Sequence, residues 1–449
     1  MKQILLMISL LGIASCAHQD QPSTAMNVAT GFVAHQLCGA AFISGIDPDH
    51  YAEDLIEPVL APAGFFFSYK TNMNQGEAVA NLGALNTSRA IYTKEFGCTR
   101  SISIQETLPQ KTKQLPPPPV KAINQQVDFA IDKAFIENSP EAKRHTSAIV
   151  VLHKGKIIGE RYATGYSAAT PIQGWLASTS MIAALIGVLT QKKMLAVTDS
   201  LSIPAWSQPG DLRQKITIEH LMRMTSGLEL GNSQTSGFMS LFDFSAQMLF
   251  TKTDMARYAE ETELKKQPGE WWNYSFASYI LLSRLVRQKI GSAKEFKAFT
   301  QKELFTPAGM LHVAMDFDKA ETPIGSSHFY ATARDWAKLG DLFLNDGVVK
   351  GKRIFPVGWA DFCAKMTPGS EDTGYGAGFW TNRGDSHGAR YRTEHGMPAD
   401  AYMARGNFGQ YVIIVPSKQL VIARFGNSFT KWDDIDAVAA LTKALVTAI

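Results

Sequence analysis

Hydroxyl side chains at the entrance of one apolar segment are the first place where this chain could do chemistry. Residues 174–189 read GWLASTSMIAALIGVL, a Gly-Trp pair, a cluster of serine and threonine, and then an apolar run. Such a run predicts a buried helix. A serine in its first turn can be a nucleophile if a lysine follows three residues later, because positions i and i+3 share a helix face.

The two serines of this cluster lack that partner. Met181 stands three residues after Ser178, and Ala183 stands three residues after Ser180. Threonine and serine hydroxyls near helix ends commonly bond to backbone groups. We therefore interpret Ser178 and Ser180 as groups that cap the helix or satisfy local backbone groups.

Other arrangements of reactive residues are weaker. His395 and Asp400 could suggest a Ser-His-Asp triad, but the chain has no Gly-x-Ser-x-Gly motif to supply its serine. The ten histidines show no metal-binding spacing such as His-Glu-x-x-His, and no cofactor or metal is predicted. Cys38 and Cys98 are the candidate disulfide, and Cys363 is expected to be a buried free thiol.

The N-terminus has the pattern of an export signal. A lysine is followed by a short apolar stretch over residues 4–13, and the small residues before Cys16 resemble a bacterial lipobox. The sequence predicts an exported bacterial lipoprotein, anchored to a membrane by a lipid on Cys16 and facing the periplasm. A plain secretory signal with an incidental cysteine is the alternative. No other segment is predicted to span a membrane.

The remaining chain divides at a proline-rich stretch. We predict a signal peptide over residues 1–15, a tether over 16–27, a small module over 28–105, a linker over 106–120 and a large domain over 121–449. Four consecutive prolines, 116–119, favour an extended linker. An apolar content of 45% and a net charge of +3 fit a globular protein and give no sign of nucleic-acid binding.

The large domain has β-rich segments at both ends and helical patterns between them. A helix is predicted over 120–137, strands over 148–152 and 157–161, two further β-rich runs joined at 416–418, and a terminal helix from about Asp433. This order predicts an α+β fold in which both chain ends form one antiparallel sheet, flanked by helices, with a mainly helical insert.

Five segments in order resemble the penicillin-recognising serine hydrolases, in the branch of class C β-lactamases, related esterases and 6-aminohexanoate-oligomer hydrolases. The segments are VVLHKGKIIGERYATGY, ITIEHLMRMTSGLEL, PGEWWNYSFASYILLSRLV, GSSHFYATARDWAKLGDLFLNDG and PADAYMARGNFGQYVIIVPSKQLVIARFG. They cover nearly all of residues 121–449. The resemblance implies the same α+β fold and hydrolysis of amide or ester bonds.

The resemblance also implies a catalytic Ser-x-x-Lys pair, which this chain lacks. Leu176 falls at the serine position and Thr179 at the lysine position. Tyr274 matches the family's third catalytic residue, whereas Phe276 replaces the asparagine of its Tyr-x-Asn motif. The last motif contributes the remaining residues of the expected binding cleft: Gly406, Asn407, Gly409 and Gln410.

These replacements predict impaired catalysis. We expect the cleft to recognise a small molecule, a peptide or a partner protein without cleaving it. The alternative is an active hydrolase of β-lactam, peptide or 6-aminohexanoate-like substrates that uses a non-standard nucleophile. A purely structural role with a sealed cleft is a third possibility.

Overall fold

The computed structural model describes residues 21–61, 63–100, 118–137, 143–232, 243–430 and 434–449. The predicted signal peptide, its acylation site Cys16 and most of the proline-rich linker lie outside the described residues.

Six antiparallel strands form the main sheet, in the order β12-β13-β14-β15-β5-β6. They are β5 (Thr146–His153), β6 (Lys156–Tyr162), β12 (Trp380–Thr381), β13 (Tyr402–Gly406), β14 (Gln410–Val415) and β15 (Leu420–Gly426). Strand β5 pairs with β15, so the two ends of the domain meet in one sheet, as predicted. Seven successive residues of β5 are buried, which is typical of a strand covered on both faces.

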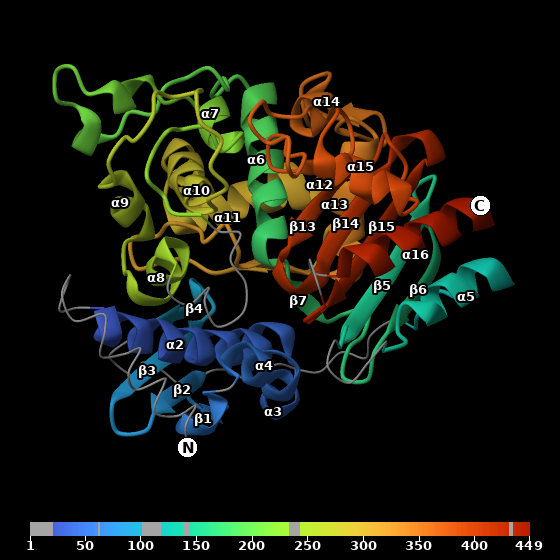
Figure 1. Ribbon diagram of the computed structural model, residues 1–449, viewed down its shortest axis with the longest axis horizontal. Helices are drawn as coiled ribbons and strands as arrows, with labels where there is room; N and C mark the ends of the chain where they lie inside the picture. Colours follow the sequence, from blue (N-terminus) through green and yellow to red (C-terminus); the bar gives the residue numbers. More distant parts are fainter. Residues whose placement is uncertain (1–20, 62, 101–117, 138–142, 233–242, 431–433) are drawn as a thin grey trace.

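Helices cover this sheet. Helix α13 (Ala333–Leu344) packs against β5, β14 and β15, while α16 (Ile435–Ala448) packs against β15 and α5 (Gln125–Lys133). Gly340 of α13 allows a close approach, because a Cβ atom there would lie 2.6 Å from the Val421 side chain. Figure 1 shows α16 and α5 beside the strands that begin and end the domain.

The helix predicted over 120–137 is shorter than expected. It begins after Asn124, whose side chain accepts a hydrogen bond from the Val127 amide at 2.8 Å. The described residues before Asn124 are not helical, and the Ile123 amide bonds to the Ile158 carbonyl at 2.9 Å. The prediction was wrong there because local pairing with β6 outweighs the apolar pattern.

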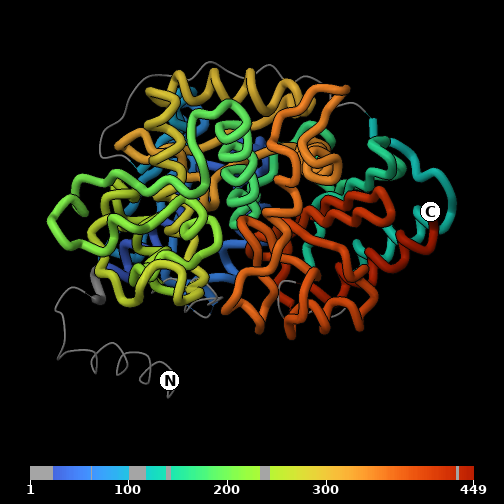
Figure 2. The backbone as a smooth tube through the Cα atoms, turned by 90° about the horizontal axis from the view of Figure 1, so that it is seen from above, coloured from blue at the N-terminus to red at the C-terminus, as the bar shows by residue number. Residues whose placement is uncertain are grey.

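A mainly helical region lies beside the sheet, as predicted. Its helices are α7 (Ile218–Met222), α8 (Phe244–Thr251), α9 (Met255–Glu260), α10 (Ala277–Ile290) and α11 (Ala293–Thr300). Helix α6 (Ser178–Gln191) lies between this region and the sheet, in contact with α10 and β13. In Figure 2, α6 occupies the centre of the molecule. The first twelve residues of α6 are all buried.

The remaining elements of the large domain are short. They are β7 (Pro171–Gln173), β8 (Val313–Met315), β9 (Phe329–Thr332), β10 (Val348–Val349), β11 (Lys352–Arg353), α12 (Thr306–Ala308), α14 (Trp359–Ala364) and α15 (His387–Glu394). Strand β9 pairs with both β7 and β8. Pairing with β9 holds β7 in place, and the turn before α6 follows β7 directly.

The N-terminal module consists of one long helix and a separate four-stranded antiparallel sheet. Its elements are α2 (Gln21–Cys38), α3 (Pro48–Tyr51), α4 (Glu57–Leu60), β1 (Phe67–Asn72), β2 (Glu77–Leu82), β3 (Asn86–Thr93) and β4 (Gly97–Arg100). Helix α2 packs on β2 and β3 and also on α8 of the large domain. Helix α2 includes residues 21–27, which the sequence analysis assigned to the tether. The predicted Cys38–Cys98 disulfide is present, with a Cα–Cα distance of 6.0 Å.

One helical stretch in the described part of the chain, Thr24–Ser44, is long and apolar enough to cross a membrane by length and composition. The sequence prediction named no such segment after the signal. Because 89% of its apolar window is buried inside the protein, packing within the module explains its composition.

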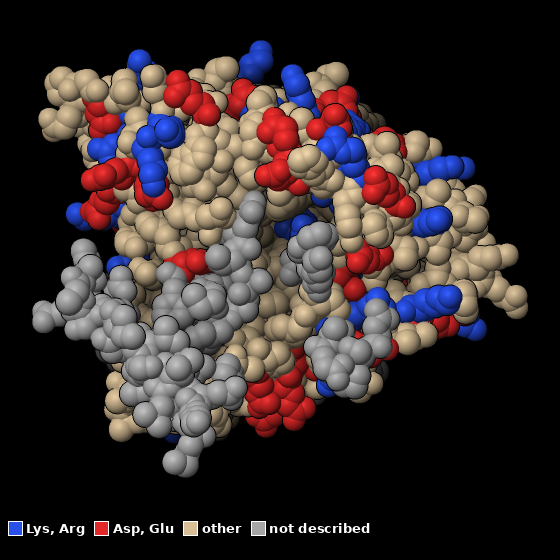
Figure 3. Space-filling view, in the orientation of Figure 1, with Lys and Arg blue, Asp and Glu red and all other residues tan. Residues whose placement is uncertain are grey.

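On the face shown in Figure 3, basic and acidic side chains are interspersed, and one acidic group lies over α3 and α4. Its exposed members are Asp47, Asp49, Glu53 and Glu57.

Candidate functional site

The position expected for the nucleophile lies in a single 3-10 turn, Trp175–Ala177, that joins β7 to α6. Leu176 is only 5% exposed there. Trp175 has a φ of +47°, which residues other than glycine rarely adopt, and its ring packs 5.1 Å from that of Phe408. A strained turn therefore presents a hydrocarbon side chain at the position where the sequence resemblance implies a serine hydroxyl.

Thr179 does not replace the missing lysine. Its hydroxyl donates a hydrogen bond to the Leu176 carbonyl at 2.8 Å, and the residue is 4% exposed. None of the lysines in the described parts of the chain is buried. A lysine can take a proton from serine at neutral pH when burial lowers the pKa of its amine. The described residues offer no such amine at this site.

Both serines of α6 bond to the backbone of other elements. The Ser178 hydroxyl accepts a hydrogen bond from the Phe329 amide at 3.3 Å, and the Ser180 hydroxyl donates to the Gly378 carbonyl at 2.5 Å. Neither residue has exposed surface. The prediction that they satisfy backbone groups is confirmed, although their partners are distant in sequence rather than local.

Aromatic side chains surround Tyr274, which is 4% exposed. Its ring centroid lies 5.1 Å from that of Trp380, 5.4 Å from that of Tyr375 and 6.1 Å from that of Trp272. We call Trp272, Tyr274, Tyr375 and Trp380 the aromatic cluster. Phe276 is also buried and precedes α10, where it supplies no amide.

The aromatic cluster reaches the lysine position. The Tyr375 hydroxyl lies near the side chains of Thr179 and Tyr279 but has no hydrogen-bond partner among the described residues. Burial raises the pKa of Tyr375 and of Tyr279, so both stay neutral. The sequence analysis missed Tyr375 and Trp380. The glycine-rich, aromatic stretch GYGAGFW at 374–380 was the signal that could have suggested them.

The end of strand β13 closes against the turn that holds Leu176. A Cβ atom at Gly406 would collide with the Gly174 carbonyl oxygen and lie 3.1 Å from the Leu176 backbone nitrogen. Glycine is therefore required for this approach. The predicted strand edge is thus brought beside the nucleophile position.

The other three residues of this motif have different roles. Asn407 is partly buried, and its Oδ1 atom has no hydrogen-bond partner among the described residues. Gly409 has a φ of +85°. Gln410 is buried, and its amide donates to the backbone carbonyls of Gly426 and Asn407, so it stabilises the fold instead of facing a ligand.

Arg405 brings a positive charge to the aromatic cluster and was also missed. Its guanidinium lies 5.0 Å from the Trp380 ring and 5.8 Å from the Tyr411 ring, within the range of cation–π attraction. A second cation, Arg392, is buried and donates to Asn382 Oδ1 at 2.6 Å. Burial lowers the pKa of Arg392 to about 10, so it remains charged at neutral pH.

Two weaker candidates are not part of this site. His395 Nδ1 contacts the Tyr391 carbonyl at 2.7 Å, whereas the Asp400 carboxylate accepts hydrogen bonds from Ser417. These residues therefore form no dyad. Cys363 is a buried free thiol in α14, as predicted, and burial raises its pKa.

The match to a family model covers most of the large domain: residues 130–445 match the Beta-lactamase family. A curated protein of Alkalihalophilus pseudofirmus, itself uncharacterized, is 21% identical over 324 residues, which are 66% of this chain and 88% of that protein.

Solved structures show the same fold at low identity. A Bacillus anthracis protein assigned as a 6-aminohexanoate-dimer hydrolase superposes with a TM-score of 0.56 at 20% identity, over 68% of this chain and 80% of that one. A penicillin-binding protein homologue from Caulobacter crescentus superposes with a TM-score of 0.56 at 13% sequence identity. The superposition covers 74% of this chain and 100% of that one. EstCE1, a hydrolase with promiscuous acyltransferase activity, superposes with a TM-score of 0.53 at 15% sequence identity, over 71% of this chain and 98% of that one. With the family match over residues 130–445, these findings establish that the chain belongs to the Beta-lactamase family.

Proposed function

We propose that this chain is a catalytically impaired member of the family, which recognises a ligand at the site around Leu176 without hydrolysing it. The observation that carries the proposal is the hydrogen bond from the Thr179 hydroxyl to the Leu176 carbonyl. It joins the two positions that should hold the nucleophile and its base. Leu176 has no nucleophilic atom, and the Thr179 hydroxyl cannot act as the amine base. In another serine hydrolase, removal of the nucleophile lowers turnover by on the order of a millionfold.

Polar and aromatic groups around the site support recognition. Trp272 Nε1 and Asn407 Oδ1 are buried atoms that have no hydrogen-bond partner among the described residues. A buried unpaired polar group costs about 1–3 kcal/mol, so a ligand that pairs with it gains affinity. Arg405 adds a positive charge beside Trp380. Trp272 Nε1 and Arg405 are donors that favour a small molecule or peptide with a carbonyl or carboxylate, whereas Asn407 Oδ1 accepts a hydrogen bond and favours an N–H group on that ligand.

We further propose that the protein is an exported lipoprotein, anchored through Cys16. The Cys38–Cys98 disulfide supports export, because such bonds persist in oxidising compartments and are rare in the cytosol. A peptidoglycan peptide or an acylated compound would then be within reach of the site.

Active-serine probes test the loss of catalysis. We expect no covalent labelling by a fluorophosphonate or by a fluorescent penicillin, with an active esterase as the positive control. Stoichiometric labelling mapped to any serine would contradict the proposal and favour a hydrolase with a non-standard nucleophile.

Tryptophan fluorescence tests recognition. Titration with an acylated peptide that ends in a free carboxylate should give saturable quenching, because Trp272 and Trp380 belong to the aromatic cluster. The change Arg405→Met should weaken binding about tenfold or more, since a charge-assisted contact contributes about 1.5–3 kcal/mol. The control Arg257→Met changes an exposed arginine and should leave binding unaltered.

A further inference from the structure

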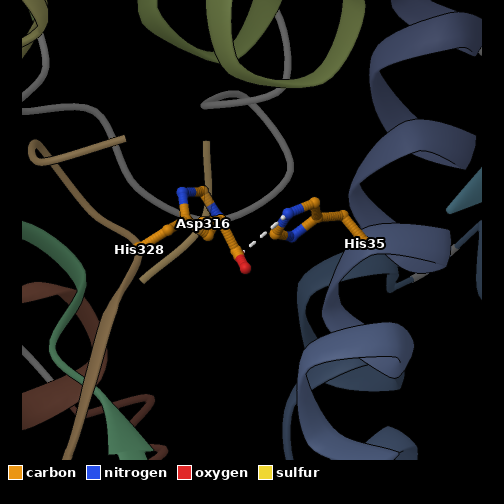
Figure 4. Close-up of side chains that lie close together, drawn as sticks. All are labelled: His35, Asp316 and His328. Atoms are coloured by element: carbon orange, nitrogen blue, oxygen red, sulfur yellow. Dashed lines mark ion pairs between the residues drawn. The ribbon is translucent and has the colours of Figure 1, made fainter. Parts of the chain in front are cut away.

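Three buried side chains that are far apart in the sequence meet between the N-terminal module and the large domain. His35 comes from α2, Asp316 follows β8, and His328 precedes β9. One potential ligand atom of each residue lies within 4.8 Å of the others. Figure 4 shows the His35 ring and the Asp316 carboxylate facing each other, with His328 beside them.

The distance between the His35 and Asp316 side chains suits a shared metal ion. His35 Nε2 lies 3.2 Å from Asp316 Oδ2. Two ligands of one tetrahedral Zn²⁺ are about 3.3 Å apart, given metal–ligand bonds of about 2.0–2.2 Å. The third group, His328, has its ring centroid 4.4 Å from that of His35, so small side-chain rotations can complete a three-ligand site.

An unpaired nitrogen points to a ligand that a simple ion pair does not explain. Among the described residues, neither His328 Nε2 nor His35 Nδ1 has a hydrogen-bond partner, and both atoms are buried. Asp316 and His328 have no exposed surface, and His35 is 8% exposed. Buried polar groups in folded proteins are nearly always paired. An ion pair between His35 and Asp316 engages only Nε2 of His35, so it leaves His35 Nδ1 and His328 Nε2 unpaired among the described residues.

Neighbouring groups orient His328 and Asp316 as they would around a metal. His35 Nε2 also lies 3.0 Å from the Cys98 carbonyl oxygen, so an ion bound through this nitrogen replaces that contact. His328 Nδ1 contacts the Ser327 hydroxyl at 2.8 Å, which leaves Nε2 as the free nitrogen. Asp316 Oδ1 accepts from the Cys98 amide at 2.8 Å, and Oδ2 accepts from the Tyr330 hydroxyl at 3.2 Å. Metal-binding histidines and carboxylates typically have such outer partners, which fix their orientation.

The surroundings indicate a structural site rather than a catalytic one. The Phe250 ring lies 6.3 Å from that of His35 and 6.4 Å from that of His328, and Trp175 lies 6.5 Å from His328. Ser327 and His328 have no exposed surface, so their contact cannot serve as a nucleophile and base for an external substrate.

We propose that His35, Asp316 and His328 bind one divalent transition-metal ion, for which Zn²⁺ is the best match, and that the ion fastens the N-terminal module to the large domain. Two imidazoles and a carboxylate are ligands that Zn²⁺ commonly takes in proteins. The site adjoins the Cys38–Cys98 disulfide through the Cys98 backbone, which contacts both His35 and Asp316. The ion and the disulfide would hold the same part of the module.

Metal titration of the whole chain, produced without a histidine tag and stripped with a chelator, tests this proposal. Co²⁺ serves as the spectroscopic probe, because tetrahedral Co²⁺ absorbs visible light strongly. We expect one Co²⁺ per chain, displaced by Zn²⁺, and a higher melting temperature with Zn²⁺. The change His328→Gln should weaken Co²⁺ binding by at least about 100-fold. The matched control His395→Gln alters an exposed histidine and should bind like the wild type.

Two results would overturn the proposal. One is a wild-type chain that takes up no stoichiometric Co²⁺ or Zn²⁺, and the other is unchanged affinity in a folded His328→Gln variant. If that variant does not fold, the wild type decides: a tetrahedral spectrum at one equivalent supports the site, and an octahedral spectrum or none refutes it.

Discussion

Replacement of Leu176 by serine tests whether the nucleophile position has become part of the core. Leu176 is 5% exposed, so its side chain is almost fully buried. Leucine-to-alanine changes in cores cost about 2–5 kcal/mol, through lost burial and the cavity that remains. Serine adds a hydroxyl that must find a partner. We therefore expect Leu176→Ser to lower the free energy of unfolding by about 3–5 kcal/mol.

Urea unfolding followed by tryptophan fluorescence measures this loss, because Trp175 is adjacent. The control Leu311→Ser changes a leucine that is 67% exposed, and it should shift stability by less than about 0.5 kcal/mol. A Leu176→Ser variant as stable as the wild type would refute the packing described for this turn. It would mean that the position tolerates a nucleophile at no cost in stability.

The same variant, combined with Thr179→Lys, extends the test to catalysis. If the rest of the site is competent, the double variant should gain measurable ester cleavage and probe labelling at position 176. A folded double variant with no gain would show that Tyr375 and its neighbours occupy the space that the lysine amine needs.

Four further predictions concern stability and burial elsewhere in the fold and at the turn before α6. Cys98→Ser removes a bridge that closes a 60-residue separation, and it should lower stability by about 4 kcal/mol in denaturant titrations under oxidising conditions; an equal midpoint in both proteins would contradict this. Gly406→Ala should lower the melting temperature, since the new methyl group would meet the backbone of residues 174–177, the turn before α6. An unchanged melting temperature would refute that contact. Burial lowers the pKa of His220, and its neutral Nδ1 accepts a hydrogen bond from the Thr217 amide at 3.2 Å. The stability that the neutral imidazole contributes is therefore lost as pH falls below about 6.5, the pKa of an unfolded histidine. His220→Gln should reduce the pH dependence of the melting temperature between pH 7 and about 5. Cys363 should react with a thiol reagent only in denaturant, because its thiol is buried and its pKa is raised; reaction in the native state would exclude a buried thiol.

The sequence determined the fold class and predicted the loss of the catalytic pair. Both depend on local information: the β-rich segments at the two ends of the domain, the apolar helix, and the identity of residues 176 and 179. Residue type alone excludes nucleophilic attack by leucine. The disulfide was also predictable, because only two cysteines precede the proline-rich linker after Cys16.

Only the tertiary structure showed what surrounds these positions. Tyr375 and Trp380 join Tyr274 through packing between segments about a hundred residues apart, and no spacing rule links them. His35, Asp316 and His328 meet because α2 of the module packs against the large domain. Sequence patterns report which residues share one helix face or one strand face. Which faces meet is set by the burial of apolar surface over the whole chain, and that is a property of the folded molecule.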